Sequence, residues 1–216
     1  MQVQVQQIRV APGQQLLMTD ISWSMYEQLL EELGEKRSSR INYSQGFLEI
    51  MVPLPEHEDN KVMISDFIKV LLEELDLEFR SLGSTTFKST SMQQGVEADD
   101  CFYIEHEADI RGKKRIDVTV DPPPDLAIEI DITSRTPLNN YVNLGVRELW
   151  RFNGKRLEIS VLQGGKYVQV QQSFHFPDFA VGQVIPEYLE RSKIEGRNRV
   201  IKEFRAWVRK QTVYRE

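Results

Sequence analysis

The amino-acid sequence predicts an α/β (α+β) protein in which a mixed central sheet is flanked by helices. Two observations favour this fold class. Segments with apolar residues every three or four positions alternate along the chain with short strand-like segments. The chain has 216 residues, of which 40% are hydrophobic and 28% charged, and these are ordinary globular proportions. A conventional packed core is therefore expected.

The first hundred residues are expected to form a helix, a hairpin, a second helix and further strands. Ser22 is a suitable N-cap for the first helix, and Gly34 is a suitable end. Gly46 lies in the expected hairpin turn. The second helix is predicted by apolar residues at helical spacing with charged residues between them. The expected ranges are, in order, 22–33, 40–43, 46–52, 57–75, 77–91 and 96–104.

The remainder of the chain is expected to be mainly strands, closed by a helix. The segment 126–132 is apolar except for Glu129 and Asp131, which is typical of a central strand buried on both faces. Asn153 and Gly154 mark a hairpin turn. The expected strands are 116–120, 126–132, 148–152, 156–162 and 167–170, and the expected helices are 139–144 and 197–209.

One folded domain with short extensions is expected, because no long Pro-, Ser- or Gly-rich tract divides the chain. We expect an N-terminal extension over 1–17, the domain over 18–190 and a C-terminal helix over 191–216. The N-terminus lacks the pattern of a secretion signal, and no segment has the apolar length of a membrane span. The single cysteine, Cys101, is interpreted as a packed thiol, which fits a reducing compartment. A cytoplasmic protein without a membrane partner is therefore expected.

The net charge of −6 argues against a broad surface that coats nucleic acid, because phosphate binding needs clustered lysines and arginines. It does not exclude a nuclease, whose metal-binding carboxylates themselves add negative charge. Basic residues do gather locally, at 111–115 and at 191–210. Two interpretations stay open for them: contact with a DNA backbone, or a solvated face on which basic and acidic residues alternate.

Glu129 and Asp131 are the most informative residues of the sequence. Residues two apart on a strand point to the same face, so both carboxylates project together. Burying two ionised acids side by side is costly unless a cation or hydrogen bonds offset the cost. Asp99, on another expected strand, adds a third acid, and three converging carboxylates suit Mg²⁺ or Mn²⁺. The alternative is that all three lie solvated at strand ends.

Three blocks of sequence, in this order, carry a resemblance to a known family. They are 95–104 (GVEADDCFYI), 123–134 (PPDLAIEIDITS) and 141–152 (YVNLGVRELWRF). The chain resembles the Uma family of endonucleases, within the PD-(D/E)XK or restriction-endonuclease-like superfamily, from about residue 18 to residue 186. The resemblance implies a restriction-endonuclease-like core.

The resemblance also implies which residues bind a metal. The superfamily pattern places an Asp on one strand, a Glu on the next and a Lys two residues after that Glu. Carried over to this sequence, Asp99 and Glu129 are the metal-binding acids, and Asp131 occupies the lysine position. Asp131 can assist in metal binding but cannot supply the positive charge. Arg135 is the candidate replacement for the lysine, and an exposed residue at a helix start is its alternative role.

His57 and Glu49 are further candidates, because the resemblance places the helix that begins near His57 beside the acids. His57 can hydrogen-bond a phosphate or a metal-bound water, or it can be a polar residue at a helix start. Asp125 follows Pro124 and so reproduces the Pro-Asp pair, but it precedes Glu129 on the same strand. We therefore interpret Asp125 as a strand-entry residue. Trp150 is interpreted as a core residue rather than as a stacking platform for bases.

The leading hypothesis from the sequence is a Mg²⁺- or Mn²⁺-dependent endonuclease that hydrolyses the phosphodiester bonds of DNA. Asp99, Glu129 and Asp131 would hold the metal. Because cutting both strands of a duplex commonly uses two active sites, a homodimer is a further expectation. Two alternatives stay open: a non-catalytic nuclease fold kept as a binding or regulatory module, and a metal-dependent hydrolase of a small phosphorylated compound.

Overall fold

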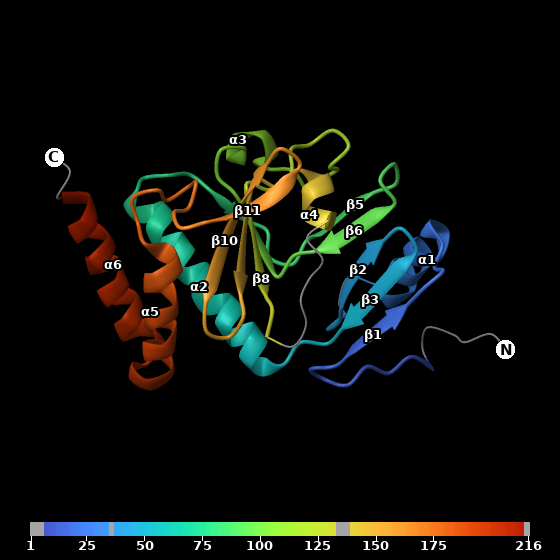
Figure 1. The fold of residues 1–216 in the computed structure, drawn as a ribbon, viewed down its shortest axis with the longest axis horizontal. Helices are drawn as coiled ribbons and strands as arrows, with labels where there is room; N and C mark the ends of the chain where they lie inside the picture. The colour runs from blue at the N-terminus through green and yellow to red at the C-terminus, as the bar shows by residue number, and fades with distance from the viewer. Residues whose placement is uncertain (1–6, 35–36, 133–138, 214–216) are drawn as a thin grey trace.

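The computed structural model of the chain describes residues 7–34, 37–132 and 139–213 (Figure 1). Its elements in chain order are β1 (Gln15–Met18), α1 (Trp23–Leu33), β2 (Arg40–Ser44), β3 (Phe47–Met51), α2 (Pro55–Glu74), β4 (Arg80–Ser81), β5 (Thr86–Ser89), β6 (Gln94–Glu97), β7 (Asp100–Tyr103), α3 (Glu107–Ile110), β8 (Leu126–Ile130), α4 (Asn139–Leu144), β9 (Glu148–Phe152), β10 (Leu157–Gln163), β11 (Lys166–Val170), α5 (Val181–Glu195) and α6 (Arg197–Val213).

The strands form two sheets. Sheet A has five strands in the order β1-β3-β2-β6-β5, all antiparallel. Sheet B has six strands in the order β11-β10-β9-β8-β7-β4. In sheet B, β8 and β9 are parallel while the other neighbours are antiparallel, so the sheet is mixed. The predicted fold class, an α/β protein with a mixed sheet and flanking helices, is confirmed.

Helices pack on the sheets, and the buried side chains form three hydrophobic clusters. Long helix α2 lies along one face of sheet B, and α5 and α6 pack on the same side at one end of the molecule (Figure 1). Their side chains form the largest cluster together with β8 and β9. A second cluster, which includes Cys101, Leu149 and Tyr141, fills the other face of sheet B. Helix α1 packs on sheet A at the opposite end.

Local sequence signals explain the first elements. The Ser22 side chain accepts a 3.2 Å hydrogen bond from the Met25 N–H and caps α1. Gly34 ends that helix with φ at 67°. Between β2 and β3, Gln45 and Gly46 both have positive φ, at 46° and 93°, which a two-residue hairpin of matching twist requires. The predicted first helix and hairpin are therefore confirmed.

One predicted strand is in fact two. The segment 96–104 was expected to be continuous, but it divides into β6, which belongs to sheet A, and β7, which belongs to sheet B. Ala98 and Asp99 form the crossing between the sheets, and both are buried. Asp99 thus lies at the junction of the two sheets.

Other expectations of secondary structure were wrong. Residues 116–120 form a turn rather than a strand, because Asp121 accepts from the Asp117 N–H and Asp117 accepts from Thr119. Helix α5 was missed. Gly182 and Pro186 disfavour a helix there, but its side chains Val181, Ile185 and Leu189 are buried, and packing outweighs propensity. The division at residues 17 and 190 stays a prediction.

The helices within the described ranges are each too short or too polar to span a membrane.

Candidate active site

Asp99 is held at the junction of the sheets by backbone contacts with β8. Its N–H donates to the Ile128 carbonyl at 3.2 Å. Its Oδ2 accepts from the Ile130 N–H at 2.8 Å. The side chain is only 3% exposed. These contacts fix the Asp99 carboxylate beside the end of β8, the strand that carries Glu129.

Two cationic side chains from other elements contact the Asp99 carboxylate. Arg40 of β2 places Nε 3.2 Å from Asp99 Oδ1, and His57 in the first turn of α2 places Nε2 3.0 Å from Oδ2. Arg40 also donates to the Ala98 carbonyl and to Glu58, each at 3.2 Å. Burial lowers the pKa of His57, but the contacts with Asp99 and Glu58 outweigh it and raise that pKa to about 9. The expected proximity of His57 to the acids is present.

Glu129 lies in the middle of sheet B and is paired with a tyrosine. The residue is 4% exposed, and it accepts a hydrogen bond from the hydroxyl of Tyr141 in α4. Burial, then the negative charges of Glu129 and Asp99, raise the pKa of Tyr141 well above its ordinary value. Tyr141 therefore keeps its hydroxyl proton and can donate a hydrogen bond to Glu129. The negative charges of both acids contribute to its raised pKa.

Asp131 follows the end of β8, and its N–H donates to the Phe152 carbonyl at 2.8 Å. Because it is two residues after Glu129, it lies on the same face of sheet B. Its Oδ2 is 3.9 Å from Nη1 of Arg151 in β9. Burial and repulsion by Asp131 raise the pKa of Glu49 in β3.

A divalent cation such as Mg²⁺ requires several oxygen ligands placed close together. Across the described ranges, there is no group of three His, Cys, Asp or Glu side chains placed to hold a metal ion. Asp131 approaches Arg151 instead, so the three-carboxylate ligand set stays a prediction. Asp99, at the crossing between the sheets, and Glu129, on β8, do have the oxygen chemistry of a Mg²⁺ site, which commonly uses one or two protein carboxylates. These two acids fit the group.

Arg40 and Arg151 are arginines that the structure places near the acids. Arg135, the predicted replacement for the missing lysine, lies outside the described residues. Arg40 and Arg151 were missed by sequence reasoning. Arg151 pairs in register with Glu129 in the parallel β8–β9 ladder, and it is buried. The available signal was an arginine inside the apolar segment 148–152, where a buried charge needs a reason.

Residues interpreted as structural are structural. Trp150 is fully buried, and its Nε1 donates to Glu148 at 2.7 Å. Cys101 is buried as well, and burial raises the pKa of its thiol. Asp125 accepts from the backbone N–H of Ile104 at 2.7 Å and lies 2.6 Å from Nδ1 of His106. It anchors the loop before β8, and His106 takes part in that anchor.

The two basic groups are largely matched with acids. Arg111 contacts Glu107, and Lys113 contacts Asp121. The C-terminal arginines pair with glutamates: Arg191 with Glu195 and Glu203, Arg199 with the same two, Arg205 with Glu73 and Glu74, and Arg209 with Glu74. These contacts favour the solvated, acid-matched interpretation of both groups.

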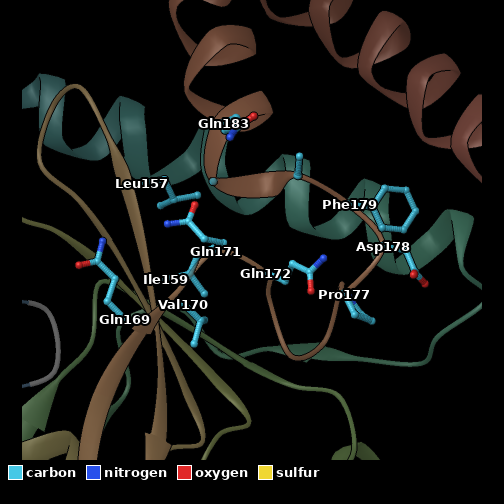
Figure 2. Close-up of a pocket in the computed structure, with 12 residues that line it drawn as sticks. Leu157, Ile159, Gln169, Val170, Gln171, Gln172, Pro177, Asp178, Phe179 and Gln183 are labelled. Carbon is cyan, nitrogen blue, oxygen red and sulfur yellow. The ribbon is translucent and has the colours of Figure 1, made fainter.

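A groove of about 360 Å³ lies between β10, β11 and the start of α5, apart from these acids (Figure 2). Leu157, Ile159 and Phe179 provide its apolar walls, and glutamines surround it. None of the candidate active-site residues lines it.

The mixed sheet with flanking helices is consistent with a restriction-endonuclease-like fold. Residues 23–192 match the model of the Uma2 family, described as "putative restriction endonuclease". The chain belongs to this family, as the sequence blocks predicted. A search of curated proteins found no match.

Proposed function

We propose that the protein is a Mg²⁺- or Mn²⁺-dependent endonuclease that hydrolyses phosphodiester bonds in DNA. The observation that carries the proposal is the position of Asp99, which the Ile130 N–H binds at the end of the strand bearing Glu129. Membership of the Uma2 family supports it.

Asp99 and Glu129 would hold the metal, with Asp131 assisting from the same strand face. When bound, the metal would activate a water molecule and stabilise the charge that develops on the phosphodiester oxygens. Tyr141 keeps the Glu129 carboxylate in place by donating a hydrogen bond to it. Arg40 and His57 hold the Asp99 carboxylate through ion-pair contacts of 3.2 and 3.0 Å.

Glu49 and Arg135 complete the proposed site. Glu49, on β3 of sheet A, would contribute a further acid at the edge of the site, and repulsion by Asp131 raises its pKa. Arg135 follows the strand that carries the acids and would contact the phosphate. A homodimer would present two such sites to the two strands of a duplex.

A non-catalytic nuclease fold is the second candidate. It is favoured by the aspartate at position 131 and by Arg40 and His57, which already contact both oxygens of Asp99. Such a protein would bind DNA or a partner without cutting.

Metal titration combined with plasmid nicking separates the two. We expect Mn²⁺ uptake by calorimetry and nicking by the wild type, and loss of both in Asp99→Asn and Glu129→Gln. Glu105→Gln, an exposed acid at the opposite end of sheet B, is the matched control and should behave as wild type. DNA binding without nicking at any metal concentration would favour the second candidate. Absence of metal uptake by the wild type would remove the nuclease proposal.

A further inference from the structure

Arg151 is a buried cation with unused hydrogen-bond donors. Its side chain is 6% exposed. Nη2 donates to Glu158 of β10 at 3.1 Å, but Nε and Nη1 have no hydrogen-bond partner among the residues that the structure describes. Nη1 lies 3.9 Å from Asp131, which is an ion-pair distance too long for a hydrogen bond. Buried N–H groups are normally satisfied, and donors of a charged group are the most costly to leave without a partner.

The unused donors lie on the face that carries the acids. Arg151 is the register partner of Glu129 across parallel strands, so the two side chains project to the same side of sheet B. Leu149, two residues earlier on β9, packs in the same cluster as Tyr141, the donor to Glu129. Arg151, Glu129 and Asp131 therefore belong to one group of side chains.

We propose that Arg151 binds a phosphate oxygen of the DNA substrate and supplies the positive charge that residue 131 does not. This inference rests on the proposed function. Carboxylates repel a phosphodiester anion, and an aspartate at position 131 adds to that repulsion. A guanidinium stays charged even when buried, and its N–H groups form strong charge-assisted hydrogen bonds with phosphate. Glu158 fixes one nitrogen and leaves the other two for the ligand.

Four variants separate phosphate binding from a structural ion pair. Arg151→Gln removes the charge and the donors. Glu158→Gln removes the fixed partner but leaves the guanidinium. Arg156→Gln removes one positive charge from the exposed turn between β9 and β10 and controls for the change in net charge. Arg151→Lys, which keeps the charge, serves if Arg151→Gln fails to fold, and it should bind more weakly than the wild type.

The measurement is the anisotropy of a fluorescent random-sequence DNA duplex in EDTA, over a series of salt concentrations. We expect Arg151→Gln to weaken binding by about 10- to 100-fold, with a shallower salt dependence, because one phosphate contact is lost. Arg156→Gln should bind as the wild type does, whereas Glu158→Gln, which keeps the guanidinium but loses the residue that orients it, should weaken binding less than Arg151→Gln does. Wild-type affinity in Arg151→Gln, an equal loss in either control, or no duplex binding by the wild type would each overturn the proposal.

Nicking assays on the same variants distinguish this inference from the nuclease proposal. A wild type that binds DNA through Arg151 but never nicks would refute the nuclease and leave the phosphate contact standing. A wild type that nicks, together with an Arg151→Gln variant that nicks equally well, would refute the contact and leave the nuclease standing.

Discussion

Replacing Arg40 with methionine should destabilise the protein strongly, because Arg40 neutralises a buried carboxylate. Its side chain contacts Asp99, Glu58 and the Ala98 carbonyl, each at 3.2 Å. The contact with Glu58 contributes little because Glu58 is 41% exposed. Among the residues that the structure describes, Asp99 would then keep His57 and one backbone N–H as partners. Removing one member of a buried pair costs about 3–5 kcal/mol.

Urea denaturation followed by circular dichroism measures this cost as a change in the free energy of unfolding. A loss of that size corresponds to a fall in Tm on the order of 10 °C for a chain of this length. The double variant Arg40→Met with Asp99→Asn should cost less than the sum of the single variants, by about 1–3 kcal/mol, since the two side chains interact directly.

An exposed ion pair gives the matched control. Lys88 and Glu27 are 3.1 Å apart, with side chains 48% and 43% exposed, so Lys88→Met should cost less than about 1 kcal/mol. If Arg40→Met costs no more than this control, or if the single costs simply add, then the pair does not hold Asp99 in the way described.

Gly95→Ala should cost about 1–3 kcal/mol in urea denaturation, because a Cβ at Gly95 would lie 2.0 Å from the buried Tyr26 hydroxyl; a neutral result would mean that Tyr26 moves aside freely. Hydrogen bonds from Arg209 lower the pKa of Glu74, so Glu74 contributes stability above its unfolded pKa, and that contribution is lost as the pH falls through the lower folded value. Tm measured from pH 7 down to pH 3 should therefore fall less in Glu74→Gln than in the wild type, and parallel curves would contradict this. Cys101 should stay unmodified by iodoacetamide until the protein is unfolded in urea, whereas labelling of the native protein would show that the thiol is accessible.

Much of the fold was readable from local patterns. The helical spacing of apolar residues predicted α2, and the apolar segment 126–132 predicted the central strand β8, which spans Leu126–Ile130. The break at Ala98–Asp99 was not readable, because the residues on both sides are suited to strands. Only the pairing of β6 with β2 and of β7 with β8 assigns them to different sheets.

The candidate site was predictable in its acids and in His57, which the resemblance placed near them, but not in Arg40 or Tyr141. Asp99 and Glu129 were indicated by sequence blocks and by the unusual position of acids in strands. Their partners Arg40, His57 and Tyr141 come from three other elements, and these contacts arise from the packing of α2 and α4 and from the position of β2. No sequence spacing predicts such contacts, because they depend on how distant segments meet.

The last helix has a consequence for how the protein is produced. The family match ends at residue 192, inside α5, yet Val200, Phe204 and Val208 of α6 are fully buried against α2 and α5. A recombinant chain that ended at residue 192 would expose apolar side chains of α2 that α6 covers in the full chain, Phe67 among them. Such a fragment should precipitate or self-associate, and expression trials should therefore retain residues through at least 213.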